Sequence, residues 1–247
     1  GQKLLNGNFA NKQFQVGAMA NETVGVSVAS AKSADLGSVT KLAFNNFEST
    51  VAGAAAGTAD SRRVAETLTF TVTESGKAAV ATEVAVAENA ESSAIAASIN
   101  ANVNGVVATA STAVRIGNTN QTNGDNVALT INGQSLGVMA VGANDTAFGA
   151  TVATAIASNA ALSGLTVSTD ANGITLRDSS GADITVAVGA ITDGDVGGGA
   201  NQVDVEAVDT DGNIIGGTGT VALTASQATK VSGDITFTTA LATGTTF

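Results

Sequence analysis

Residues 127–141 read VALTINGQSLGVMAV, and this stretch decides the fold. Apolar residues fill every second position of its first five residues, which is the period of a half-buried strand. The Asn132-Gly133 pair that follows is typical of a two-residue hairpin turn, because both turn residues need a positive φ. The stretch therefore predicts a strand, a tight turn and a return strand over residues 135–141.

After this hairpin the apolar period changes from two to nearly four. Asn144 or Asp145 stands where it can cap the first turn of a helix. The predicted helix covers about residues 146–161, and three apolar side chains spaced by four form its buried face: Phe148, Val152 and Ile156.

Short strands and turns follow this helix. Residues 165–167, 174–176 and 184–188 alternate as strands do, and turn residues stand between them at 170–173 and at Ser180-Gly181.

An earlier part of the chain repeats this order of elements. Residues 67–72 and 79–86 are predicted strands, and residues 106–116 return as a strand after Asn104-Gly105. A helix is predicted between them, over residues 88–102. Ile95 and Ile99 are four apart, and Glu88 and Glu91 favour a helix N-terminus.

We therefore expect an α+β fold that is mainly β, with antiparallel sheets and two short helices. Residues 66–117 and 125–189 form two related strand–strand–helix–strand units, and each helix covers one face of a small antiparallel sheet. A further hairpin is predicted within residues 13–28, and a tail of strands and turns from residue 203. Residues 48–62 are mostly small and are predicted to be a connector.

The composition restricts the chemistry. The 247 residues contain no His, Cys, Trp, Tyr or Pro, so the usual acid–base side chain and thiolate chemistry are missing. The formal net charge is -11, and the 10 basic residues are scattered, which argues against a nucleic-acid partner. No apolar run approaches the roughly 18 residues of a membrane span. Acids crowd between Asp178 and Asp234 around a single base, Lys230, and favour a soluble, self-repelling surface.

Three spaced motifs open the chain: GQKLLNGNF at residues 1–9, KQFQVGA at 12–18 and NETV at 21–24. They resemble the segment of bacterial flagellins that follows the long N-terminal helices, where an FNGxxLLxG turn leads into xxFQ[VI]GA and a hairpin. A second resemblance lies in LTING at 129–133, its downstream helix and VSTDANGITL at 167–176. It is similar to the repeated module of flagellin outer domains and filament-cap proteins, the flagellin IN motif.

The resemblance implies a domain plan. Residues 1–48 would be the inner-domain hairpin remnant and connector, 49–124 the first outer unit and 125–199 the second, IN-motif-like unit. Residues 200–247 would be a β-rich return segment that packs on the outer or the inner domain. The terminal helices that assemble flagellin filaments have no counterpart here, and the chain starts without a signal peptide. We therefore expect a piece of a longer protein that is monomeric alone and assembles with other subunits through those helices.

Several motifs have simpler explanations than a binding site. Residues 209–213 resemble the start of a calcium loop, but Thr220 stands where the bidentate Glu is needed, so a polar turn is preferred. Asp193-Gly194-Asp195 has the same explanation, and the glycines at 197–199 lack the Lys-Ser/Thr of a phosphate loop. The Asn-x-Ser/Thr sequons, which we interpret as chance matches, begin at Asn21, Asn120 and Asn144.

Two acid pairs could suggest glycoside chemistry. We interpret Glu88–Glu91 as a helix start and Asp204–Glu206 as an exposed strand face. No catalytic, cofactor-binding or metal residue is therefore assigned, no cofactor is expected, and the protein is not expected to be an enzyme.

The resemblance implies a structural subunit of the flagellar filament, secreted and extracellular, whose outer domains serve motility. One alternative is a filament-cap or hook-associated protein, since the repeated module occurs there too. An alternative of another class is an adhesive, glycan-binding surface module.

Overall fold

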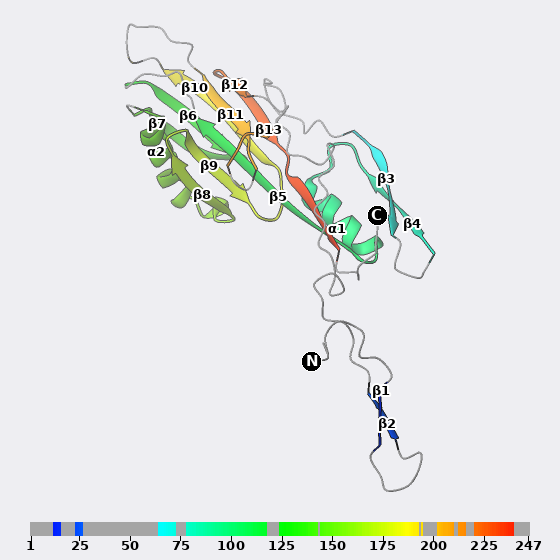
Figure 1. Cartoon of the computed structure of the whole chain (residues 1–247). Helices are drawn as coiled ribbons and strands as arrows, with labels where there is room; N and C mark the ends of the chain where they lie inside the picture. Colours follow the sequence, from blue (N-terminus) through cyan, green and yellow to red (C-terminus); the bar gives the residue numbers. More distant parts are fainter. Residues whose placement is uncertain are drawn as a thin grey trace.

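A computed structural model describes residues 12–15, 23–26, 64–72, 78–117, 124–142, 144–192, 194, 202–209, 212–215 and 220–239 (Figure 1). Within these ranges the protein is mainly β, with antiparallel sheets and two α-helices, so the expected α+β class is confirmed. The elements are β1 (Lys12–Gln15), β2 (Thr23–Val26), β3 (Glu66–Val72), β4 (Val80–Val86), α1 (Ser92–Asn102), β5 (Val106–Gly117), β6 (Asn126–Ile131), β7 (Gln134–Ala140), α2 (Asp145–Ala157), the 3-10 helix η1 (Ala160–Leu162), β8 (Leu165–Asp170), β9 (Gly173–Asp178), β10 (Ile184–Thr192), β11 (Val203–Ala207), β12 (Val221–Leu223), β13 (Gln227–Val231) and β14 (Asp234–Thr239).

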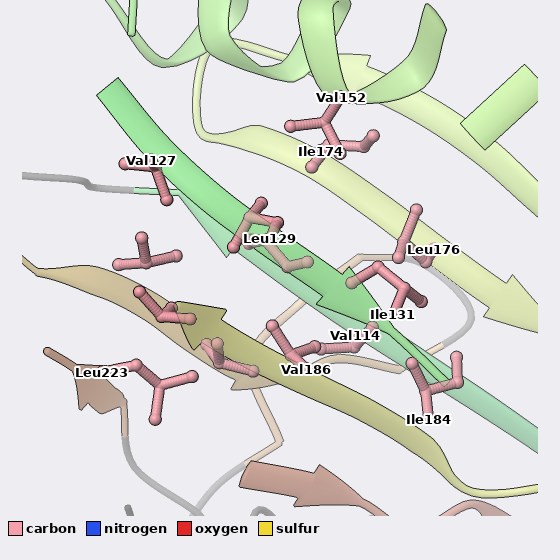
Figure 2. Close-up of a cluster of buried hydrophobic side chains, with 14 of the residues drawn as sticks. Val114, Val127, Leu129, Ile131, Val152, Ile174, Leu176, Ile184, Val186 and Leu223 are labelled. Atoms are coloured by element: carbon pink, nitrogen blue, oxygen red, sulfur yellow. The ribbon is translucent and has the colours of Figure 1, made fainter. Parts of the chain in front are cut away.

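Two sheets enclose the larger of two hydrophobic cores. One sheet has the order β13-β10-β6-β7, and the other has the order β12-β11-β5-β9-β8. Helix α2 contacts β8 and β9 of one sheet and β7 of the other, so it closes the side where both sheets end. Figure 2 shows side chains from β5, β6, β9, β10 and α2 pointing toward one another. The buried side chains labelled there are Val114, Val127, Leu129, Ile131, Val152, Ile174, Leu176, Ile184, Val186 and Leu223.

The smaller core lies between α1, the β3–β4 hairpin and a ribbon made by β14 and the first half of β5. Phe70 and Phe237 meet edge to face, with ring centroids 5.7 Å apart, a favoured aromatic geometry. The other buried members are Val72, Val84, Val86, Ile95, Ala96, Ile99, Val103, Val106, Ala108 and Ile235.

Strand β5 belongs to both cores. Val106 and Ala108 face the smaller core, whereas Val114 and Ile116 face the larger one. The expected order of strand, strand, helix and strand occurs twice, as β3-β4-α1-β5 and β6-β7-α2-β8. Strand β5 of the first set pairs with β9, which follows the second set, and β10 pairs with β6 and β13 rather than with β9.

Local sequence explains the hairpin turn and the start of the second helix as predicted, although α2 ends at Ala157 rather than near residue 161. Asn132 has φ 48° and Gly133 has φ 75°, the signs required by the tight hairpin turn. The Asn132 side-chain oxygen also accepts a hydrogen bond from the Thr185 backbone N–H at 2.8 Å. Asn144 caps α2 by accepting from the Ala147 N–H at 2.9 Å, and the helical residues Phe148, Val152 and Ile156 are buried.

Two sequence expectations need correction. Helix α1 begins at Ser92 rather than at residue 88, because residues 88 and 89 form a turn in which Asn89 has φ 57°. Strand β13 was not predicted, since its sequence QATKV has no clear alternation. The connector expected at 48–62 lies outside the described residues.

Near the start of the chain, β1 and β2 pair antiparallel, as the opening motifs predict, with Phe14 opposite Val24 and Lys12 opposite Val26. Opposite residues share a face, so Phe14, Val24 and Val26 lie on one side of this hairpin. All three side chains are exposed.

Candidate functional sites

An ion pair joins β5 to β11 on the side of their sheet that faces away from the larger core. Arg115 and Glu206 are directly opposite each other in the register, and both side chains are 14% exposed. The Arg115 Nε–H donates to Glu206 Oε2 at 2.8 Å, and the Nη2–H donates to the same oxygen. The Thr220 hydroxyl donates to the other carboxylate oxygen at 2.6 Å.

This arrangement overturns the expectation that Asp204 and Glu206 form an exposed strand face. Asp204 is only 4% exposed, and its carboxylate accepts a hydrogen bond from the Gln202 side-chain amide at 3.0 Å. Glu206 is half-buried in the network with Arg115 and Thr220. The partner Arg115 lies about ninety residues earlier in the chain, so its pairing could not be inferred from local spacing.

A second ion pair lies at the end of the larger core. Lys230 Nζ is 3.9 Å from Asp183 Oδ2, and the Asp183 side chain is 4% exposed. All six acids of the crowded region that the structure describes are buried or half-buried: Asp178, Asp183, Asp204, Glu206, Asp209 and Asp234. The expectation that this whole region forms a self-repelling surface is wrong for these six residues.

Polar groups connect the N-terminus of α1 to the larger core. The buried Ser92 hydroxyl donates to the Gly233 carbonyl at 2.6 Å, and the Ser93 N–H donates to the Gly181 carbonyl at 3.1 Å. Gly233 lies between β13 and β14, and a Cβ there would be 2.4 Å from the Thr112 hydroxyl oxygen. These contacts join the two cores where their backbones pack closely.

The candidate calcium loop forms a polar turn where it is described. Asp209 accepts hydrogen bonds from the Asn213 backbone N–H at 2.8 Å and from its side-chain amide at 3.1 Å. Residues 210 and 211 lie outside the described residues. Elsewhere in the described ranges, no group of three or more carboxylates is placed to hold a metal ion.

Some of the remaining candidate motifs have a structural role, and others lie outside the described residues. Asn144 uses its side-chain oxygen as the α2 cap. Glu91 precedes α1 without a side-chain capping bond, and Glu88 lies in the turn before it. The sequons at Asn21 and Asn120, the glycines at 197–199 and the residues Asp193 and Asp195 lie outside the described residues.

A shallow apolar pocket of about 300 Å³ lies beside the edge strand β8. Helix α2 and η1 supply one wall, and Leu165 and Val167 of β8 supply the other. The only polar residues in its lining are Asn159 and Ser163, and the Asn159 side chain already accepts from the Ala161 N–H at 3.1 Å. The sequence did not predict this pocket, because the pocket depends on how η1 is placed relative to β8.

Of the two α-helices in the described residues, neither is long and apolar enough to cross a membrane.

No protein-family model matches the chain. Among curated proteins it is similar to Flagellin A of Helicobacter felis, with 56% identity over 39 residues. The matched segment is 16% of this chain and spans only 8% of that flagellin. A short part of the chain is therefore flagellin-like in sequence.

Proposed function

We propose that this chain is the outer, surface-displayed part of a flagellin, a structural subunit of the bacterial flagellar filament that serves motility. The observation that carries this proposal is the 56% identity to Flagellin A over 39 residues. The spaced motifs at residues 1–24 agree with it, because they resemble in order the segment after the N-terminal helices of flagellins.

The proposal includes a domain plan and a place of action. Residues 1–48 would carry the inner-domain hairpin, and residues 49–124 and 125–199 the two outer units. Residues 200–247 would return the chain toward the filament core. Subunits would assemble through terminal helices beyond this chain, and the protein would act outside the cell as a structural component rather than as an enzyme.

The described residues suit a structural role through their bonding. Two sheets share one apolar core, and the ion pair of Arg115 with Glu206 crosses adjacent strands. The chain contains no Cys, so this part of the protein depends on hydrogen bonds and packing rather than on disulfides. Such a fold can be exported unfolded and can then form without a redox step.

Immunogold electron microscopy of the source cells tests the proposal, using antibody raised against this chain. We expect regular labelling along the whole filament, since each subunit would display this part on the surface. Antibody that is depleted on the purified chain is the control.

Other labelling patterns would contradict the proposal in different ways. Gold confined to the filament tip or to the hook junction would indicate a filament-cap or hook-associated protein. Gold on the cell body beside unlabelled filaments would indicate an adhesive surface module.

A further inference from the structure

Strand β8 ends its sheet with one long side unpaired among the described residues. Its six residues pair with β9 in unbroken register from Leu165 opposite Asp178 to Asp170 opposite Gly173. In an antiparallel ladder alternate residues direct their N–H and C=O groups away from the partner strand. The free side of β8 therefore presents backbone donors and acceptors that another strand can bind.

The first five residues of β8 lack the features that usually protect an edge. Residues 165–169 read LTVST and contain no charge, no Pro and no bulge. The other three sheet edges of the larger core each have such a feature. Strand β7 is bulged at Gly137, which has φ 81°. Strand β12 has only three residues, and β13 carries the charged Lys230. Among these four edges, β8 is the one open to strand addition.

The apolar pocket beside β8 adds a place for side chains. Leu165 and Val167 point to the α2 side of the sheet and form part of the pocket wall. A strand added to β8 would continue this face, so its inward side chains would lie along the open mouth of the pocket. Backbone pairing at an edge combined with a pocket for alternate side chains is the basis of β-strand addition.

We propose that this edge binds the β8 strand of a second copy of this chain, in an antiparallel pair centred on Val167. In this register Val167 faces its own copy, Leu165 faces Thr169, and Thr166 faces Ser168. Leu165, Val167 and Thr169 of both copies then share the inner face, and the hydroxyls of Thr166 and Ser168 meet on the outer face, where Thr–Ser pairs are favourable. Asp170 falls opposite Gly164, so no like charges face each other across the pair.

The register follows from the pleat. Opposite residues must lie on the same face for the two sheets to continue each other, so the two residue numbers must add to an even sum. Centring on Val167 pairs all five uncharged residues, whereas centring on Ser168 brings Asp170 opposite Thr166 and leaves Leu165 unpaired. The arrangement is a two-fold, isologous contact.

The contact is weak by itself. One six-residue strand pair buries much less than the roughly 1,000 Å² of a stable interface, and the net charge of -11 makes two copies repel. The chain is therefore monomeric when dilute, and the strands pair where copies are held close together, which raises their effective concentration. Salt should strengthen the contact by screening the repulsion.

Register-specific disulfide trapping tests the proposal with the full chain, which has no Cys of its own. Thr166 and Ser168 are exposed, so Thr166→Cys and Ser168→Cys leave the core intact. Because Thr166 faces Ser168 in the pair, we expect a mixture of the two variants to form crosslinked dimers several-fold faster than either variant alone. The rate should rise with added salt.

Thr154→Cys, on the exposed side of α2, is the control for random collision. Equal crosslinking in the mixture, in each single variant and in the Thr154→Cys control would overturn the proposal. So would faster crosslinking of Ser168→Cys alone, which indicates a pair centred on Ser168. This readout is made in solution and is independent of immunogold labelling, so either proposal can fail without the other.

Discussion

Arg115 and Glu206 illustrate how a single residue pair can matter to this fold. Replacing Glu206 with Gln would leave the Arg115 guanidinium mostly buried without its counter-charge. We expect Glu206→Gln to lower the free energy of unfolding by about 2 kcal/mol, since one partner of a mostly buried pair is lost. Urea unfolding followed by circular dichroism measures the change.

Glu83→Gln is the matched control for this pair, because Glu83 is exposed on β4. Its free energy of unfolding should stay within about 0.5 kcal/mol of the parent value, as for most surface changes. Equal losses for the two variants would contradict a stabilising role of the pair.

Three glycines allow close backbone contact where β5, α2 and the β8–β9 turn meet. A Cβ on Gly173 would be 2.2 Å from the Ile116 carbonyl oxygen, and one on Gly117 would be 2.0 Å from the Asn172 carbonyl oxygen. A Cβ added to Gly149 of α2 would likewise lie 2.9 Å from the Gly173 carbonyl oxygen. Side chains are excluded here because three backbones approach one another.

Gly173→Ala should therefore destabilise the protein by more than about 2 kcal/mol, since backbone atoms must move and the φ of 114° is unfavourable for Ala. Gly133→Ala is the control: its φ is 75°, but nothing lies within 4 Å of the added methyl. That change should cost only about 1 kcal/mol of backbone strain. Thermal unfolding of both variants separates crowding from strain, and equal losses would contradict the crowding.

At the scale of one element, the two helices differ at their starts. Asn144→Ala removes the bond to the Ala147 N–H and should lower stability by about 1 kcal/mol. Glu91→Ala changes the equivalent position of α1, where no side-chain capping bond exists, and should have almost no effect. Urea unfolding of both variants is the measurement, and a larger loss for Glu91→Ala would contradict this assignment of caps.

Elements were predictable where local chemistry decides them. Asn132-Gly133 and the stripe Phe148, Val152 and Ile156 correctly predicted a turn and a buried helix face. Strand β13 was missed because its stability comes from pairing with β10 rather than from its own pattern. The partner of Glu206 and the pocket beside β8 were equally hidden, since both depend on residues that are distant in sequence.

At the scale of the whole molecule, the strand pairing predicts how pieces of the chain behave. Residues 125–199 include β6 to β10 but lack β5, the partner of β9, and β13, the partner of β10. They also lack Val114, Ile116 and Val205, which are buried in the larger core. We expect the fragment 125–199 to show no cooperative thermal unfolding by circular dichroism.

A fragment of residues 64–239 is the control, because it contains every strand that supplies either core. It should unfold in a cooperative transition close to that of the full chain. Cooperative unfolding of 125–199 alone would contradict the view that β5 and β13 complete its core. The repeated element order was visible in the sequence, whereas the exchange of strands between the two halves is a long-range property.

The joint between the cores has a mechanical consequence. Strand β5 is one covalent path between the cores, and the continuous run of β13 and β14 is another. Six register pairs hold β14 against β5, and both β3 and β14 end in the smaller core. A force that pulls the two cores apart is therefore shared by two backbone connections. No single strand bears the whole tension.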